Sequence, residues 1–333
     1  SEFQSMDRKN FDHHILAAMA DNLSNSLREM ARCGHSRSKR ATLTEMSIQL
    51  SGFKQTLADP QKRQELVTSC RRANREPLKI PANVQFSVPV KLVTAPYPLI
   101  WLNQNAQARN LIVYLAGGAF VQRPLKGHWQ FLNRLAKAAD AEIVVPDYPL
   151  APDHDFKDAY QELLDLYKWL YDQRPVSSII LMGDSSGAGL AAGFCENLAQ
   201  QGLPQPGRLV LISPWLDLQL GNPLIKKYAA KDRLLDQEGL RALGKLWAGQ
   251  TDPRDARLSP LNGPVDQLRN VTIYIGTHEI MYPDAIHFTR RLKAAGVNTN
   301  TVIGRGMFHS YPLYPIPESE HVIMEMAHDF DQQ

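Results

Sequence analysis

The sequence is poor in the features that define several classes of protein. Among its 333 residues there are only three cysteines, Cys33, Cys70 and Cys195, and no two of them form a C-x-x-C pair. Neither a disulfide framework nor a thiolate metal site is expected, and a reducing, cytoplasmic location fits this cysteine usage. The longest apolar run, residues 111–121, is interrupted by two glycines and falls short of the roughly 18 residues of a membrane span.

An excess of one charge is also missing. The 37 Lys and Arg residues against 34 Asp and Glu residues leave a net charge of +3, so a nucleic-acid partner is not expected. Hydrophobic residues make up 44% of the chain and charged residues 21%, which excludes a disordered tail and favours a large buried core. The start shows no basic-then-apolar secretory pattern, and residues 1–5, which precede Met6, are interpreted as an expression scar.

Three helices are predicted near the N-terminus. Apolar residues from Phe11 to Met30 recur at steps of three and four. Thr42 and Glu45 have the spacing of a capping box ahead of a second helix that runs to about Leu57. Asp59 followed by Pro60 predicts the start of a third helix that reaches about Asn74. We therefore expect residues 6–80 to form an N-terminal helical cap segment.

Further along, the period changes from helical to alternating. Residues 84–92 alternate apolar and polar side chains around Pro89, which predicts an edge strand. Apolar runs then alternate with stretches of helix length, at residues 111–115, 143–145, 179–182, 209–212, 271–275 and 301–303. This pattern predicts an α/β fold over residues 81–333, with a mostly parallel central sheet and helices on both faces. The interval between Ile212 and Val271 is too long for one crossover, so inserted cap helices are expected at about 220–250.

One glycine-rich turn carries a catalytic motif. Residues 183–187 read Gly-Asp-Ser-Ser-Gly, the G-x-S-x-G pattern, directly after a predicted buried strand and before a predicted helix. Ser185 is the candidate nucleophile, and the amide of Ser186 at the helix N-terminus is a candidate oxyanion donor. The alternatives are a plain turn with a capping serine, or a dinucleotide fingerprint from Gly187 to Ala192. No acidic residue ends the next strand, which counts against the second.

A serine nucleophile needs a base and an acid, which in this kind of sheet follow in the order Ser, acid, His. His309 is the candidate base because it lies in a loop rich in Gly and Pro just after a predicted strand. Glu279 and Asp284 both follow the strand at 271–275, and Glu279, the nearer, is preferred as the acid. Asp284 is predicted to cap a helix after Pro283. His278 beside Glu279 lacks the second histidine of a zinc site, so no metal is expected.

The reaction of a serine nucleophile also needs a pair of backbone amides that bind the oxyanion. The segment 114–120 follows a predicted strand, and Gly117 and Gly118 in it allow the backbone to approach a bound carbonyl closely. An ordinary glycine turn is the alternative interpretation. With Ser186, these two glycines complete the predicted oxyanion hole.

From about Val84 onwards, the chain resembles the hormone-sensitive-lipase-like branch of the α/β-hydrolases, in particular its bacterial esterases. The motifs H-G-G-G-[FW], D-Y-R-L-A-P-E, G-D-S-A-G-G, S-P-L and G-M-x-H-x-F correspond to residues 116–120, 147–153, 183–188, 259–261 and 306–311. The resemblance implies hydrolysis of carboxylic esters through an acyl-enzyme, without a cofactor, in a pocket beneath a helical cap. Three positions depart from the family: Ala116 replaces the loop histidine, Ala119 the third glycine, and Glu279 the usual Asp.

The sequence thus predicts a serine carboxylesterase whose partner is a small-molecule ester, with short acyl chains preferred. Two alternatives stay open: a ligand-binding receptor that has lost catalysis, which Ala116 suggests, and an amide, formamide or lactone hydrolase with the same triad. A homodimer is also left open.

Overall fold

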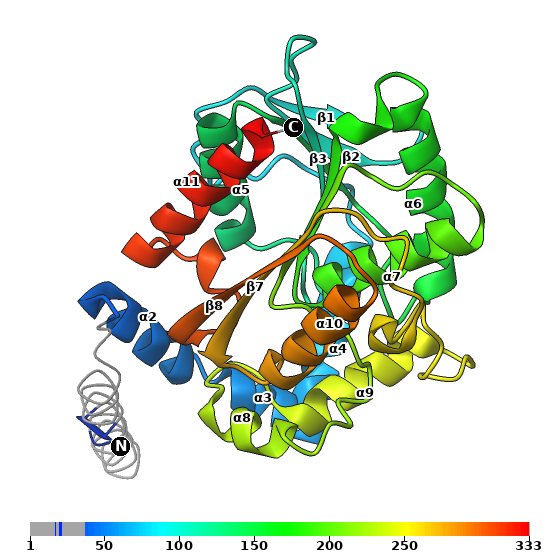
Figure 1. Ribbon diagram of the computed structural model, residues 1–333. Coiled ribbons are helices and arrows are strands. Elements are labelled where there is room, and N and C mark those ends of the chain that lie inside the picture. Colours follow the sequence, from blue (N-terminus) through cyan, green and yellow to red (C-terminus); the bar gives the residue numbers. More distant parts are fainter. Residues whose placement is uncertain (1–16, 18–19, 22–36, 333) are drawn as a thin grey trace.

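The computed structural model describes residues 17, 20, 21 and 37–332 (Figure 1). Apart from residues 17, 20 and 21, the helix predicted between Phe11 and Met30 lies outside these residues. Within them, no helix is long and apolar enough to cross a membrane.

Residues 90–308 contribute an eight-stranded sheet in the order β1-β2-β4-β3-β5-β6-β7-β8. The strands β1 and β2 are antiparallel to each other, β2 is antiparallel to β4, and all other neighbours are parallel. The predicted mostly parallel sheet is therefore confirmed. The strands are β1 (Val90–Val93), β2 (Leu99–Leu102), β3 (Leu111–Leu115), β4 (Glu142–Pro146), β5 (Ile179–Asp184), β6 (Arg208–Ile212), β7 (Val271–His278) and β8 (Thr299–Phe308).

Two details of the sheet differ from the sequence prediction. The alternating stretch that begins at Val84 enters a strand only at Val90, and Val84, Phe86 and Val88 instead pack as loop residues against the core. The strand β2 was not predicted. It has four residues, all buried, and short strands with buried faces show no alternation that sequence periodicity can detect.

Helices cover both faces of the sheet, and each face has its own apolar core. One face carries α5 (Lys126–Ala139) and α11 (Pro317–Asp331), and the other carries α6 (Phe156–Tyr171), α7 (Ser186–Gln200) and α10 (Tyr282–Ala294) (Figure 1). Short 3₁₀ turns lie at η1 (Val176–Ser178), η2 (Pro260–Asn262) and η3 (Tyr311–Leu313). The sheet is thus buried from both sides, as its near-continuous apolar strands require.

The N-terminal helices are α2 (Lys39–Leu50), α3 (Phe53–Ala58) and α4 (Pro60–Asn74). Asp59 caps α4 as predicted, since its side chain accepts hydrogen bonds from the next residues' amides. The predicted capping box is wrong: Ser38 caps α2, and Thr42 lies inside that helix. The single helix expected through Leu57 is divided at Gly52, whose φ of 72° is a left-handed conformation that interrupts the helix.

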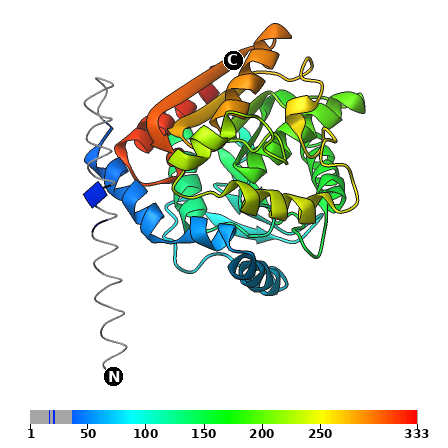
Figure 2. The same cartoon turned by 90° about the horizontal axis from the view of Figure 1, so that it is seen from below.

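The long segment between β6 and β7 contains α8 (Ile225–Lys231) and α9 (Gln237–Ala248). These helices pack against the N-terminal ones, and Figure 2 shows α3, α4 and α9 next to one another. The approach of α9 to α3 is close, because a Cβ atom added at Gly239 would lie 2.4 Å from the carbonyl oxygen of Leu57. Both groups of helices gather at the end of the sheet toward which β7 and β8 run (Figure 1).

Candidate active site

Ser185 lies on the turn between β5 and α7, in the strained backbone conformation that a nucleophile elbow requires. Its φ is 53° and its ψ is −120°, a region that residues other than glycine rarely adopt. The glycine on the helix side of the turn is sterically required, because a Cβ atom at Gly187 would lie 2.0 Å from the carbonyl oxygen of Leu115. The tight crossing of strand and helix therefore presents the Ser185 side chain at the edge of the sheet.

Ser185, His309 and Glu279 form a hydrogen-bonded row. The His309 Nε2 atom lies 2.9 Å from Ser185 Oγ, and its Nδ1 atom lies 2.9 Å from Glu279 Oε1. Glu279 is fully buried and His309 is only 4% exposed. The structure thus brings together three side chains that lie on separate loops, after β5, β7 and β8, in the arrangement of a nucleophile, a base and an orienting acid.

The second carboxylate oxygen of Glu279 has two further donors. Its Oε2 atom accepts hydrogen bonds from the Ser213 hydroxyl and from the Gly276 amide, both at 2.8 Å. Ser213 Oγ in turn accepts a hydrogen bond from the amide of Ser310, the residue after His309. Ser213 was not singled out in the sequence, although its place directly after β6 is a signal that it faces the active-site edge of the sheet.

The surroundings of His309 favour its protonated form. Burial by itself lowers the pKa of His309, but the hydrogen bond and the charge of Glu279, followed by the charges of Asp232 and Asp184, raise that pKa above its ordinary value overall. An imidazole that gains stability when it takes up a proton is suited to act as a general base.

Asp284, the alternative acid, does not lie at His309, since both ring nitrogens of His309 are occupied by Ser185 and Glu279. It is buried in the first turn of α10, and Met281 occupies the N-cap position that the sequence prediction gave to Asp284. Burial and the nearby charge of Asp217 raise the pKa of Asp284 to about 7, although the side chain of Asn222 acts in the opposite direction. Neither carboxylate oxygen of Asp284 has a hydrogen-bond partner within the described residues.

Asp184, the residue before the nucleophile, organises the glycine loop after β3. It accepts hydrogen bonds from the Tyr114 hydroxyl at 2.7 Å and from the Gly117 amide at 3.0 Å, and His128 Nε2 lies 3.1 Å from it. Burial raises the pKa of Asp184, but the charge and hydrogen bond of His128 and the donors from the loop lower it overall. Gly117 was predicted to bind the oxyanion, but its N–H instead donates to the buried Asp184 carboxylate and holds the loop in place.

The rest of the loop offers amides for an oxyanion. The Gly118 amide donates to the Ser186 hydroxyl at 3.1 Å, and a φ of 157° at Gly118 is followed by one of 52° at Ala119. Within the described chain, the amides of Ala119 and Ser186 have no acceptor. Ala116 takes the place of the family's loop histidine. Its backbone carbonyl oxygen accepts a hydrogen bond from the hydroxyl of Tyr148.

Comparison with known proteins shows the family to which the chain belongs. The family model described as the α/β-hydrolase fold matches residues 112–313, more than half of the chain. The chain belongs to the α/β-hydrolase family. It is 32% identical to an esterase of Acinetobacter venetianus over 231 residues, which cover 68% of this chain and 76% of that protein. It is 30% identical to an acetyl-hydrolase of Streptomyces hygroscopicus over 226 residues, which cover 67% and 76%.

A solved structure is similar over most of its length. This is the hormone-sensitive-lipase homologue EstE7 from a metagenome library, with a TM-score of 0.73, 25% sequence identity, and coverage of 87% of this chain and 97% of that one. The resemblance to hormone-sensitive-lipase-like bacterial esterases, predicted from the motifs, is thereby confirmed.

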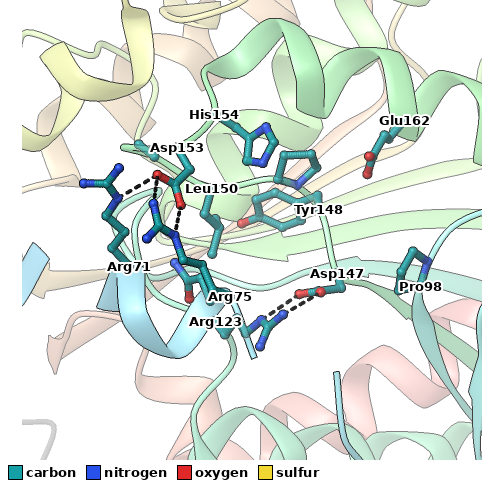
Figure 3. A pocket seen from close by; sticks show the side chains of 13 residues that line it. Arg71, Arg75, Pro98, Arg123, Asp147, Tyr148, Leu150, Asp153, His154 and Glu162 are labelled. Atoms are coloured by element: carbon teal, nitrogen blue, oxygen red, sulfur yellow. Dashed lines mark hydrogen bonds and ion pairs between the residues drawn. The ribbon is translucent and has the colours of Figure 1, made fainter. Parts of the chain in front are cut away.

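This hydrolase also has a charged cavity of about 290 Å³, which none of the three triad residues lines (Figure 3). Arg71 of α4 and Arg75, the residue after this helix, form ion pairs with Asp153. Arg123 forms one with Asp147 and also donates a hydrogen bond to the carbonyl oxygen of Ala73 in α4. These contacts attach the N-terminal helices to the segment 147–153, which matches the family's D-Y-R-L-A-P-E motif. The arginines that line the cavity are paired with carboxylates. We therefore interpret the cavity as part of the contact between the N-terminal helices and the segment 147–153.

Among the residues that the structure describes, no group of three or more His, Cys, Asp or Glu side chains is arranged to hold a metal ion.

Proposed function

We propose that this protein is a serine carboxylesterase, which hydrolyses short-chain acyl esters through an acyl-enzyme intermediate. The observation that carries the proposal is the row Ser185–His309–Glu279, with both hydrogen bonds at 2.9 Å. Membership in the α/β-hydrolase family supports it, as do relatives named esterase and acetyl-hydrolase.

In the first half of the reaction, His309 Nε2 takes the proton of Ser185 Oγ as this oxygen attacks the ester carbonyl. Glu279 holds the Nδ1–H side of the ring and stabilises the imidazolium. When the tetrahedral intermediate collapses, His309 gives its proton to the departing alcohol and the acyl group stays on Ser185. In the second half, His309 takes a proton from water as this water attacks the acyl carbonyl. When the second tetrahedral intermediate collapses, His309 returns the proton to Ser185 Oγ, the bond between the acyl carbon and Ser185 Oγ breaks, and the carboxylic acid leaves.

The negative oxygen of each tetrahedral intermediate needs preorganised donors. We assign this role to the amide of Ser186, as expected from the sequence, and to the amide of Ala119, in the place that Gly117 was predicted to fill. The Gly118 amide, the other donor expected from the sequence, joins them when it exchanges its hydrogen bond to the Ser186 hydroxyl for one to the oxyanion. Ser186 is the first residue of α7, so its N–H has no partner within the helix and lies at the positive end of the helix dipole.

The nucleophile can be tested by chemical labelling. An organophosphonate should attach to Ser185, and mass spectrometry of the digested protein locates the adduct. Ser185→Ala should lose both the label and the hydrolysis of a chromogenic acetyl ester. Ser310→Ala is the matched control, because Ser310 follows His309 and its hydroxyl has no hydrogen-bond partner within the described residues. Label on Ser186 or Ser310, or a fully active Ser185→Ala, contradicts the proposal.

The preference for short acyl chains rests on the packing beside the elbow. The Trp215 amide donates to the Ser185 carbonyl at 3.1 Å, and the ring of Trp215 lies 5.3 Å from that of Phe120. Phe120 stacks on Trp247 of α9 at 4.6 Å, and all three side chains are buried. Large rigid rings limit the space beside Ser185, so kcat/KM should be highest for about C2 to C6 acyl chains. A rise through C12, or activation by micelles, contradicts this.

A cytoplasmic location is part of the same proposal. It is supported by the cysteine usage, and Cys70 and Cys195 are free and buried in the part of the chain that the structure describes. Cell fractionation followed by an activity assay of each fraction tests the location.

A further inference from the structure

Asp232 is a buried carboxylate outside the triad that makes contact with the loop of the catalytic acid. It follows the last residue of α8 and is 1% exposed. Its Oδ1 atom accepts hydrogen bonds from the amides of Leu234 and Leu235, and its Oδ2 atom accepts one from the amide of Ile280, all at 2.9 Å. One carboxylate thus joins the inserted helical segment to the loop after β7.

The contact with Ile280 acts on the backbone of Glu279 itself. The N–H of Ile280 and the carbonyl of Glu279 belong to one planar peptide unit, so a bond to that N–H fixes the orientation of the unit. Glutamate is one methylene longer than the aspartate usual in this family, and its backbone must stand correspondingly farther from His309. Asp232 holds the peptide after Glu279 at the position from which Oε1 lies 2.9 Å from His309 Nδ1.

The N-terminal helices take part in the same arrangement. The ammonium of Lys54, on α3, donates hydrogen bonds to the carbonyl oxygens of Ala229 at 2.7 Å and of Asp232 at 2.6 Å. It thereby binds the C-terminal end of α8, where the helix carbonyls lack partners within the helix. A continuous set of contacts runs from α3 through Lys54 and Asp232 to the Glu279 loop.

We propose that Asp232 is a positioning residue for the esterase reaction, which sets the acid–histidine geometry from the inserted helical segment and, through Lys54, from α3. The inference rests on the proposed function. Within the described residues, the Asp232 carboxylate binds only backbone amides and has no hydrogen bond to the side chains of Ser185, His309 or Glu279. Its loss should therefore act on kcat and leave KM largely unchanged.

The charge of Asp232 provides a second, independent readout. The carboxylates that face His309 are Glu279, Asp232 and Asp184, and each raises the pKa of His309. Burial raises the pKa of Asp232 itself overall, although His309 and three backbone amides act in the opposite direction. The positively charged group that faces Asp232 from α3 is Lys54. Neutralising Asp232 should therefore lower the pKa of His309.

The experiment compares Asp232→Asn with Asp236→Asn. Asp236 is the matched control because it also caps a helix of the inserted segment, by accepting from the Gly239 amide at 2.9 Å, and has no hydrogen bond to the Glu279 loop. For Asp232→Asn, kcat should fall about 10-fold to 100-fold with KM within about 2-fold of the wild type, since small misplacements at the reacting groups have effects of this size. The acid limb of kcat/KM should move to lower pH. For Asp236→Asn, both quantities should stay at their wild-type values.

An unchanged kcat and pH profile in Asp232→Asn, or the same loss in both variants, overturns the inference. If Asp232→Asn does not fold, Lys54→Gln replaces it, since this variant removes only the outer link. A kcat reduced by about threefold or more at an unchanged melting temperature then supports the coupling, and a wild-type kcat overturns it. Ser185→Ala separates the two claims: if it is active, the proposed function fails, whereas an inactive Ser185→Ala beside a normal Asp232→Asn defeats only the role of Asp232.

Discussion

Two acidic side chains, Glu279 and Asp284, lie close together after β7, and both are completely buried. Glu279 faces hydrogen-bond donors: the Ser213 hydroxyl, the Gly276 amide and the ring of His309. Asp284 faces another carboxylate, that of Asp217, which together with burial raises its pKa to about 7. Equally buried carboxylates thus have different surroundings: donors bind both oxygens of Glu279, whereas burial and a like charge raise the pKa of Asp284.

The difference between the two positions arises from the local backbone. Glu279 lies in the turn between β7 and α10. Its side chain points back along the chain and accepts a hydrogen bond from the amide of Gly276, three residues earlier. Asp284 lies in the first turn of α10, whose direction takes the side chain toward the segment after β6 that carries Asp217. A separation of five residues is enough to place one carboxylate in the triad and the other outside it.

The largest expected effect comes from removing the charge of Glu279. Glu279→Gln should lower kcat by roughly 10³-fold to 10⁴-fold, because the amide neither stabilises the imidazolium nor holds the correct tautomer. Asp284→Asn should keep kcat within about 2-fold, since this residue has no contact with His309. Steady-state kinetics with a chromogenic acetyl ester, on variants of matched thermal stability, measures both.

The assignment of Glu279 as the acid is wrong if Asp284→Asn loses activity and Glu279→Gln keeps it. An inactive Asp284→Asn beside an active Glu279→Gln means that the acid changes partner when substrate binds, and Glu279 is then a structural residue.

The next effect concerns the donors that bind the second carboxylate oxygen of Glu279. Ser213→Ala removes one hydrogen bond to Glu279 Oε2 and the acceptor of the Ser310 amide. We expect kcat to fall about 10-fold, because a hydrogen bond to a charged group contributes about 1.5 kcal/mol or more. Ser310→Ala is the control, since it leaves the backbone amide in place. An unchanged kcat in Ser213→Ala indicates that the Gly276 amide and His309 alone hold Glu279.

Much of this arrangement could be predicted from the sequence because it depends on local patterns. The parallel strands appear as apolar runs, and the elbow at Ser185 requires glycines at fixed positions beside it. The order of nucleophile, acid and base along the chain then limited the choice to Glu279 or Asp284 and His309. Each of these inferences uses residues that are close in sequence or follow a strand end, where the fold itself dictates that side chains meet.

What was missed depends on contacts between distant segments. Ser213 and Asp232 each act on the Glu279 loop from another part of the chain, and neither has a sequence pattern of its own. The Gly117 amide was assigned to the oxyanion because nothing in the neighbouring sequence indicates that this amide donates a hydrogen bond to Asp184. The capping box at Thr42 failed because Ser38, four residues earlier, competes for the same helix start.

A smaller effect is expected in the pH dependence of catalysis. His309 must be neutral to accept the Ser185 proton, so kcat/KM should fall as the pH decreases through the pKa of His309. That pKa lies above its ordinary value of 6.5, although burial alone would lower it, because Glu279, Asp232 and Asp184 face the ring. A pH profile measured with an ester whose own charge does not change should place the acid limb above pH 6.5. A limb below this value contradicts the assigned surroundings of His309.

The smallest effect on activity belongs to Asp284→Asn, which should act on stability instead. The pKa of Asp284 is about 7 in the folded protein, against an ordinary value of 3.8. As the pH rises from about 4 to 7, the unfolded chain loses this proton while the folded protein keeps it, so Asp284 makes the folded state progressively less stable. Above pH 7 this loss of folding stability no longer grows.

Because asparagine cannot ionise, Asp284→Asn should be more stable than the wild type by up to about 4 kcal/mol at pH 8 and nearly equal to it at pH 4. Urea denaturation at both pH values measures this difference, and an advantage independent of pH means that Asp284 is already charged in the folded protein.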